Sequence, residues 1–221
     1  MPYVPFNNVL SDADVALLRA LGRAADDAGV RLWAVAGVVR DALLGSAVVD
    51  IDLASETPAA ELGPVLAASV GGTIAKLTTF GTLNLRVGER KFDLATARAE
   101  RYAHPGALPE VTPTDISSDL ARRDFSVNAM AASLAPDDFG KLVDLHGGLA
   151  DLSARRIRAL HADSFQDDPT RQLRALRYAA RLRFRIERRT SIWMRRDRHH
   201  LRALSPARAR HELELLVDEP T

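Results

Sequence analysis

The spacing of hydrophobic residues changes along the chain from a mixed pattern to a helical one. Ser11 precedes an apolar run that repeats every three to four residues, which predicts a capped helix ending near Gly29. Short apolar runs then alternate with helical spacing. They predict helices at 38–44 and 58–69, and strands at 32–35, 48–53, 73–77, 82–87 and 91–96. This half of the chain is therefore predicted to be a mixed α and β domain.

The second half of the chain is predicted to consist of a loop followed mainly by helices. Four prolines and glycines between residues 103 and 115 predict a loop outside the sheet. Beyond Asp119 the apolar spacing is helical, and it predicts helices at 126–134, 169–183, 187–202 and 206–217. We therefore expect an α+β fold with a mixed sheet of about five strands and flanking helices in residues 1–145, followed by an all-α domain in residues 146–221.

The composition limits which reactive and metal-binding groups the chain can contain. The chain has 221 residues, is 47% hydrophobic and contains no cysteine, which excludes disulfides, thiolate nucleophiles and cysteine zinc sites. A metal would then be held by oxygen or imidazole ligands. The sequence shows no apolar run near the roughly 20 residues that a membrane span needs, and no signal peptide, so a cytoplasmic location is expected.

Charge is unevenly distributed. The net charge is only +1, but residues 171–210 hold 14 arginines against Glu187 and Asp197. An acidic N-terminal part thus precedes a strongly basic C-terminal part, which suggests an anionic partner. The alternative is that arginines simply decorate solvated helices, although this does not explain why acidic residues are scarce in the same stretch.

Two carboxylates lie two residues apart in a predicted strand. Because side chains alternate along a strand, Asp50 and Asp52 leave one face while Ile51 and Leu53 enter the core. Two like charges this close favour a bound cation, and a pair of metal ions would activate a hydroxyl for in-line displacement at phosphorus. Taken alone, such a pair is more often a pair of surface or turn acids.

The segment before these carboxylates turns from a strand into a helix. Gly37 would let the backbone approach a ligand closely, and the free N–H groups of the helix start suit phosphate oxygens. An ordinary glycine turn is the competing interpretation.

A third group of polar residues lies in the helical half. Asp168 and Arg171 are three residues apart, so they share a helix face that Arg174 and Arg177 extend. A carboxylate beside a guanidinium can satisfy the pairing edge of a nucleobase, and further arginines can neutralise triphosphate. The alternative is that Asp168 is a helix cap with an intrahelical ion pair to Arg171.

A fourth group precedes this helix. Arg122, Arg123 and Asp124 form a charged tripeptide, and Asn128 would return to the helix face of Asp124. An acid and an amide on one face could hold a ribose hydroxyl, whereas a bare charged tripeptide is usually solvated surface.

Together these segments resemble a known family. Five segments match, in order, the class II tRNA nucleotidyltransferases (CCA-adding enzymes) and bacterial poly(A) polymerases, and the matches run from about residue 33 to residue 213. They are Gly37-x-x-Arg40-Asp41-x-x-Leu44-Gly45 with Asp50-x-Asp52, Gly81-Thr82 with Phe92-Asp93-Leu94, Asp119 to Ala131, Gly147-Gly148 with Asp151-Leu152 and Ile157-Arg158, and Asp167 to Arg174.

The resemblance implies a polymerase-β-like nucleotidyltransferase head at 1–145 and a helical neck at 146–221. It implies template-independent addition of CCA, or its terminal A, to the 3′ end of tRNA from CTP and ATP, with Mg²⁺ in a two-metal mechanism. By the same resemblance, Asp50, Asp52 and Asp93 are catalytic, with metal on Asp50 and Asp52. The implied nucleotide-binding residues are Gly37, Arg40, Arg122, Arg123, Asp124, Asn128, Asp168, Arg171, Arg174 and Arg177.

Alternatives and departures from the family pattern remain. The alternatives are poly(A) synthesis, and a catalytically silent nucleotide- or RNA-binding module of the same fold. Ala36 stands where the family usually has glycine, so a positive φ there would be strained by about 1 kcal/mol. Asp167 replaces a common glutamate, and the body and tail domains of the family have no counterpart in this sequence.

Overall fold

The computed structural model describes residues 2–48, 50–78 and 81–219. The chain divides into two compact units, each built from more than one segment. The first unit comprises residues 1–99, 112–121 and 128–145, and the second comprises residues 100–111, 122–127 and 146–221.

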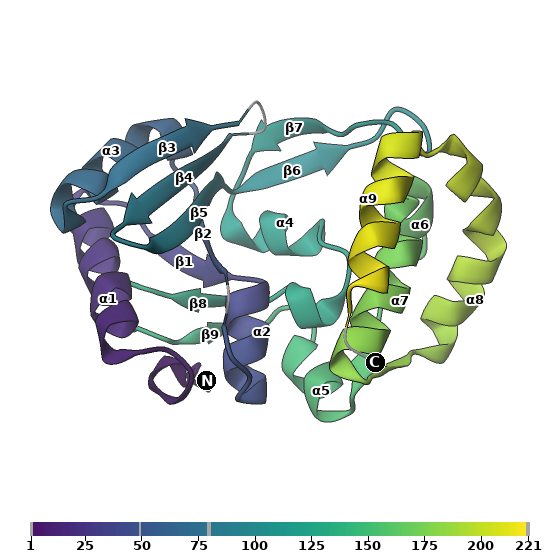
Figure 1. Cartoon of the computed structure of the whole chain (residues 1–221), viewed down its shortest axis with the longest axis horizontal. Helices are drawn as coiled ribbons and strands as arrows, with labels where there is room; N and C mark the ends of the chain where they lie inside the picture. Colours follow the sequence, from purple (N-terminus) through teal and green to yellow (C-terminus); the bar gives the residue numbers. More distant parts are fainter. Residues whose placement is uncertain (1, 49, 79–80, 220–221) are drawn as a thin grey trace. The chain divides into compact units, whose positions relative to one another are not determined.

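A mixed sheet is the framework of the first unit (Figure 1). Within the described residues it has seven strands in the order β3-β4-β5-β2-β1-β8-β9. The strands are β1 (Leu32–Val35), β2 (Ile51–Ser55), β3 (Thr73–Leu77), β4 (Thr82–Val87), β5 (Arg90–Thr96), β8 (Ala131–Ser133) and β9 (Leu142–Val143). β2 and β5 are parallel, whereas β1 pairs antiparallel with both β2 and β8.

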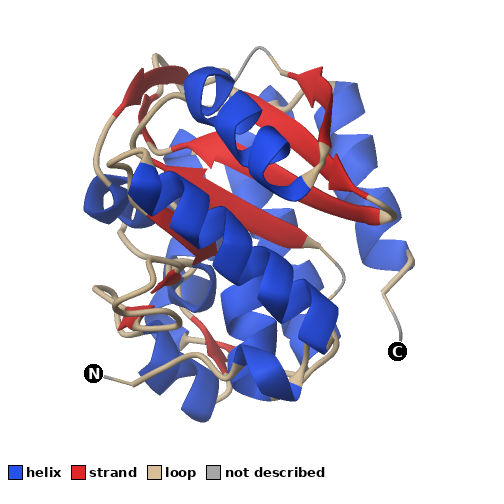
Figure 2. Ribbon diagram, turned by 90° about the vertical axis from the view of Figure 1, so that its left-hand side faces the viewer, coloured by secondary structure: helices blue, strands red, loops and turns tan. Residues whose placement is uncertain are grey.

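Two helices, α1 (Asp12–Asp27) and α3 (Ala59–Val70), cover one face of this sheet and pack on each other (Figure 2). A glycine in each helix lets it approach the sheet layer closely. A Cβ on Gly22 would lie 1.9 Å from the carbonyl oxygen of Leu134, and one on Gly63 would lie 2.5 Å from a methyl carbon of Leu83. The side chains of Leu32, Ala34 and other apolar strand residues of this face are buried.

The opposite face is covered in part by α4 (Ile116–Ala121). Trp33 and Val35 of β1 and Ala54 of β2 form a buried cluster there with Ile116 and Leu120 of α4. Asp52 has the same alternation as Ala54, so its side chain leaves the sheet on this face. The first unit also contains η1 (Phe6–Asn8) and α2 (Gly37–Leu44).

The second unit is mainly helical. Its elements are α5 (Gly148–Ser153), α6 (Ser164–Asp167), α7 (Thr170–Leu182), α8 (Arg188–Asp197), η3 (Arg198–Ala203) and α9 (Pro206–Val217), with the short parallel strands β10 (Arg156–Ile157) and β11 (Arg185–Ile186). Asp151 is 1% exposed and anchors the unit, because Ser126 Oγ donates to it at 2.6 Å and Arg156 and Arg158 pair with it at 2.7 and 2.6 Å.

The remaining elements lie where the chain passes between units. β6 (Arg98–Arg101) and β7 (Glu110–Pro113) pair as a separate two-stranded sheet, and η2 (Ser126–Asn128) precedes β8. No helix in the described part of the chain is both long and apolar enough to cross a membrane.

The α+β class with a mixed sheet and flanking helices is confirmed, and several details differ. The described sheet has seven strands rather than about five, because β8 and β9 extend it. The predicted helix at 126–134 is wrong, since that segment is η2 followed by β8, and the argument placing Asp124 and Asn128 on one helix face therefore fails.

Smaller differences concern element ends. β7 lies within the stretch predicted as a loop, and the second unit contains the β10–β11 pair in addition to helices. α3 begins at Ala59, one residue after the predicted start, and Pro58 occupies its N-cap position.

Candidate active site

A row of polar side chains crosses three neighbouring strands of the first unit. Asp52 on β2 lies directly opposite Asp93 on β5, and Asp93 lies opposite Asn84 on β4. Residues opposite one another in a ladder leave the sheet on the same face. The Asn84 amide donates to Asp93 at 2.5 Å, and Lys91 Nζ pairs with Asp93 at 3.0 Å. The sheet therefore places two carboxylates side by side and fixes one of them with an amide and an ammonium group.

Asp50 precedes β2 by one residue and is exposed, whereas Asp52 is half-buried. Both carry carboxylate oxygens, the ligand type that hard divalent cations prefer. Among the residues described, no three or more Asp, Glu or His side chains gather closely enough to hold a metal ion. The donor chemistry of Asp50 and Asp52 thus suits a cation such as Mg²⁺, while Asp93 is already held by its neighbours.

The strand-to-helix turn carries an unusual backbone conformation. Ala36 has φ 58° and ψ −115°, a conformation that residues with a side chain rarely adopt. The turn is fixed from both sides: Ala36 N–H donates to the Met130 carbonyl at 3.2 Å, and the Ala36 carbonyl accepts from Arg40 N–H at 3.0 Å. The positive φ that would make alanine unfavourable here is therefore present.

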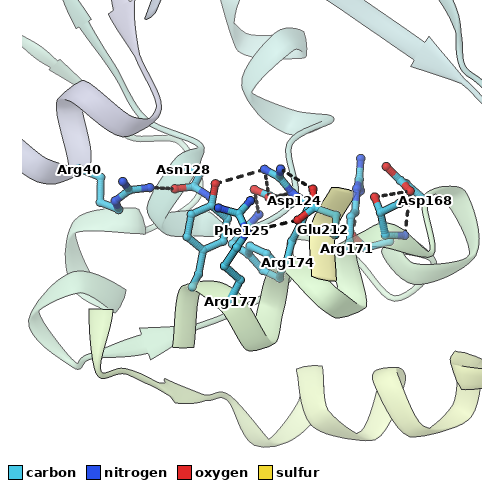
Figure 3. A network of polar contacts seen from close by, with 12 residues as sticks. Arg40, Asp124, Phe125, Asn128, Asp168, Arg171, Arg174, Arg177 and Glu212 are labelled. Carbon is cyan, nitrogen blue, oxygen red and sulfur yellow. Dashed lines mark hydrogen bonds and ion pairs between the residues drawn. The ribbon is translucent and has the colours of Figure 1, made fainter. Parts of the chain in front are cut away.

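Arg40 is buried at this turn. Its guanidinium donates twice to Asp41, at 2.8 and 2.9 Å, and once to the Asn128 side-chain oxygen at 2.6 Å (Figure 3). Arg40 is 3% exposed, and Asn128 is 4% exposed. The contact ties the start of α2 to the segment before β8, so two predicted nucleotide-binding residues are brought together. Gly37 begins α2.

In the second unit, Asp168 precedes α7 in an extended conformation, so the prediction that it shares a helix face with Arg171 is wrong. The two residues have separate partners. The Asp168 carboxylate accepts from Thr170 N–H at 2.9 Å and from Thr170 Oγ at 2.7 Å. The buried Arg171 guanidinium donates to Ser164 Oγ at 2.8 Å and to the Arg122 carbonyl at 2.7 Å. Asp168 therefore stabilises the turn that opens α7, and Arg171 ties α7 to α6 and to the Arg122 segment.

Arg174 and Arg177 lie one and two turns further along α7, within a dense polar network (Figure 3). Arg174 pairs with Asp124 at 2.7 Å and with Glu212 at 3.5 Å, and Arg177 donates to Glu212 at 3.2 Å. Burial tends to lower the pKa of Arg174, but Asp124, Tyr178 and Glu212 together raise it, so this guanidinium stays charged. Both guanidinium groups also lie over the Tyr178 ring.

The Arg122 segment is held by residues that follow β5. Arg122 Nη1 donates to Glu100 at 2.6 Å, and the Tyr102 hydroxyl donates to the same carboxylate at 2.7 Å. Burial and the Glu100 carboxylate raise the pKa of Tyr102. Arg123 is half-buried.

The predicted site residues fall into two sets, one in each unit. Within the first unit the structure brings together Asp52 with Asp93, and Arg40 with Asn128; within the second it brings together Asp124 with Arg174, and Arg171 with Arg122. Their roles in catalysis and nucleotide binding stay predictions.

Several interacting residues were missed from the sequence. Glu212 binds Arg174 and Arg177, Arg208 binds Asp168, and Asn84 binds Asp93. The spacing of Arg208 and Glu212, four apart on one helix, is a weak signal that could have marked α9. Asn84 carries no comparable signal, because its partner lies on another strand.

Comparisons with known proteins give a consistent result. A family model described as Poly A polymerase head domain matches residues 32–158. The chain is 48% identical over 161 residues to an A-adding tRNA nucleotidyltransferase of Aquifex aeolicus, a match covering 73% of this chain and 20% of that protein. It is 41% identical over 218 residues to an A-adding tRNA nucleotidyltransferase of Halalkalibacterium halodurans, covering 96% of this chain and 51% of that protein.

Solved structures agree. An apo form of a CCA-adding enzyme superposes with a TM-score of 0.94 at 37% identity, covering 100% of this chain and 53% of that one. The chain thus spans from a fifth to about half of the length of these proteins.

Proposed function

Because the chain belongs to the family described as Poly A polymerase head domain, we propose that it is a template-independent RNA nucleotidyltransferase that adds CCA, or its terminal A, to the 3′ end of tRNA. CTP and ATP would be the nucleotide substrates, with release of pyrophosphate. The observation that carries the proposal is the pairing of Asp52 with Asp93 on adjacent strands, with Asp50 two residues before Asp52. Similarity to A-adding and CCA-adding proteins supports it.

Asp50 and Asp52 would hold the divalent cation, which we propose to be Mg²⁺ in a two-metal arrangement. When bound, such cations lower the pKa of an attacking hydroxyl and neutralise a pyrophosphate leaving group. Asp93 stands beside Asp52 in the ladder, so its negative charge adds to the attraction for a cation. Asn84 and Lys91 keep the Asp93 carboxylate in one orientation.

The start of α2 would bind the triphosphate. The first N–H groups of a helix have no intrahelical partner and point toward an anion. Gly37 keeps this position free of a side chain, and Arg40 holds the helix start in place through Asp41 and Asn128. In this proposal Arg40 acts by its charge and by positioning the turn.

α7 and the segment before η2 would recognise the base and ribose. Asp168 can accept a hydrogen bond from the amino group that cytosine and adenine share, and Arg171 can donate to a neighbouring ring nitrogen or carbonyl. Arg122, Arg123 and Asp124 would contact ribose and phosphate. Arg174 and Arg177, anchored by Asp124 and Glu212, would supply positive charge close to the nucleotide.

The length of one segment bears on which nucleotides are added. The segment from Arg98 to Asp119 is long enough to include the flexible loop that the family resemblance leads us to expect in CCA- or A-adding members, which favours A or CCA addition over CC addition alone. Poly(A) synthesis and a silent binding module are alternative outcomes of the test below. A cytoplasmic location is part of the same proposal.

The test is incorporation of labelled CTP and ATP, separately and together with Mg²⁺, into tRNA that ends before CCA and tRNA that ends in CC. Ordered addition to both tRNAs supports CCA synthesis, and use of ATP only on the CC-ending tRNA supports A addition. Long homopolymeric A tails would indicate a poly(A) polymerase.

Variants separate catalysis from binding. Asp50→Ala and Asp52→Ala should abolish incorporation while nucleotide binding survives, because they remove metal ligands and leave the base-binding residues intact. Asp26→Ala, which removes an exposed carboxylate from α1, is the matched control. Incorporation that persists in both aspartate variants would refute the assigned site, and nucleotide binding without incorporation by the unaltered chain would favour a binding module.

A further inference from the structure

Arg208 on α9 links Asp168 to the loop at Gly106 within the second unit. It belongs to none of the sequence motifs and has no role in the reaction proposed above. Its Nη2 atom donates to Asp168 Oδ1 at 2.8 Å, and its Nη1 atom donates to the Gly106 carbonyl at 3.0 Å. The Arg208 side chain is 26% exposed and the Asp168 side chain 19%. A guanidinium bound from two sides, with most of its surface covered, has a defined orientation.

The contacts of Asp168 show what this bridge does. Thr170 N–H, Thr170 Oγ and Arg208 Nη2 all bind the same carboxylate oxygen, Oδ1. A carboxylate with three donors on one oxygen cannot rotate freely, and its second oxygen, Oδ2, is turned away from these donors. Oδ1 of the carboxylate is thus occupied by protein donors, and Oδ2 points away from them.

We propose that Arg208 is a positioning residue for base selection: it fixes Asp168 so that Oδ2 accepts the amino group of the incoming base. This inference rests on the proposed nucleotidyltransferase function. Cytosine and adenine carry an amino donor at this place on the pairing edge, whereas uracil and guanine carry a carbonyl oxygen. A fixed anionic acceptor therefore binds the first pair and repels the second.

The bond to Gly106 explains why α9 can hold the carboxylate firmly. Gly106 has φ +80°, and a Cβ there would lie 2.8 Å from the Ala203 carbonyl oxygen, so this loop packs closely on η3. The Gly106 carbonyl thus gives the guanidinium a second fixed point. Without Arg208, Thr170 would be the remaining hydrogen-bond partner of the Asp168 carboxylate among the residues that the structure describes, and the carboxylate would sample other rotamers.

The experiment measures equilibrium binding of ATP, CTP, GTP and UTP to the full chain in the absence of RNA, so its readout does not need catalysis. In Arg208→Ala, the preference for ATP over GTP should fall by about tenfold, equal to about 1.4 kcal/mol. Arg208→Lys should give an intermediate ratio, because an ammonium group keeps the charge but lacks the two-pronged geometry. Arg210→Ala removes the same charge from an exposed position of α9 and should leave the ratio unchanged.

A double-mutant cycle tests whether Arg208 acts through Asp168. In an Asp168→Asn background, which already lacks the anionic acceptor, Arg208→Ala should not lower the ratio further. Far-ultraviolet circular dichroism and the unfolding midpoint report whether each variant is folded, and Arg208→Lys carries the test if Arg208→Ala unfolds.

The outcomes are distinct. An unchanged ATP to GTP ratio in folded Arg208→Ala and Arg208→Lys, with clear discrimination by the unaltered chain, would overturn the role of Arg208 and leave the proposed function standing. Equal affinity of the unaltered chain for all four nucleotides would overturn both. A loss of ratio that persists in the Asp168→Asn background would show that Arg208 acts by another route and would also overturn the proposal.

Discussion

Replacing Ala36 with glycine should stabilise the first unit. Ala36 has φ 58° and ψ −115°, and hydrogen bonds on both sides hold it in that conformation. The lack of a Cβ lets glycine adopt this conformation without steric cost. The substitution therefore removes strain without removing either backbone hydrogen bond.

The expected gain follows from three opposing effects. A residue held in a sparsely populated backbone region costs about 1 to 3 kcal/mol. Glycine gives back about 0.4 to 1 kcal/mol through the greater freedom of the unfolded chain. Loss of a half-buried methyl group costs roughly another 0.4 kcal/mol, half the value of a fully buried one. The net effect is a free energy of unfolding raised by about 1 kcal/mol, or about 2 to 4 °C in Tm for a chain of this size.

The assay is urea and thermal unfolding of the full chain. Ala16→Gly is the matched control, because Ala16 is exposed in the second turn of α1, where the same substitution should destabilise the chain by about 0.5 to 1 kcal/mol. The two alanine-to-glycine substitutions should thus have opposite signs. If Ala36→Gly destabilises the chain as much as Ala16→Gly does, the positive φ is not a source of strain and the reasoning fails.

Two further predictions concern the second unit. Asp151→Ala should lower the free energy of unfolding by about 1 to 3 kcal/mol, since it removes the acceptor of Ser126 Oγ and the partner of two arginines that stay partly exposed. An equilibrium urea titration measures this loss, and a loss below about 0.5 kcal/mol would contradict the prediction. Glu187 caps α8 by accepting from Thr190 N–H at 2.7 Å, and although burial opposes it, this bonding lowers the pKa of Glu187. Glu187→Ala should therefore cost about 1 kcal/mol at pH 7. The pKa of Glu187 is lower in the folded state than in the unfolded state. The difference in unfolding free energy between the unaltered chain and Glu187→Ala should therefore be fully present above the unfolded pKa of about 4.5, and it should vanish as pH falls through the folded-state pKa. A difference that persists at pH 2 would contradict the capping role of Glu187.

Elements whose signals are local were predicted well from the sequence. Ser11 was predicted to cap the first helix, and its hydroxyl accepts from Asp14 N–H at 3.1 Å at the start of α1. The strand at 32–35 and the helix ending before Gly45 agree with β1 and α2. In each case a cap, a turn residue or a short apolar run marks the element within a few residues of itself.

β8 shows where local signals fail. Ala131 and Ala132 favour a helix by intrinsic propensity, yet they form a strand that pairs with β1 and β9. All three residues of β8 are buried, so β8 lacks the alternation of apolar and polar residues that marks a strand with one solvent-exposed face. Only the partner strands, about a hundred residues earlier and ten residues later, decide its conformation.

In the candidate site, too, local features were predicted and long-range partners were not. The alternation of a strand predicted that Asp50 and Asp52 leave one face, but it could not identify β5 as the neighbour that carries Asp93. The helix that carries Arg171, Arg174 and Arg177 was predicted, but Asp168 lies before it in an extended conformation, and the partners of these arginines were not predicted. Asp124 lies 50 residues before Arg174, and Arg208 lies 40 residues after Asp168, and no periodicity links positions so far apart.

Each unit is assembled from separate segments of the chain, and this affects folding during synthesis and recombination between relatives. Residues 100–111 and 122–127 leave the ribosome before most of the second unit to which they belong. Asp124 can therefore pair with Arg174 only after another 50 residues have been synthesised. A cut after Leu145 would leave both early segments attached to the first unit without their partners. Recombination between relatives should consequently preserve the second unit only when all three of its segments come from the same parent.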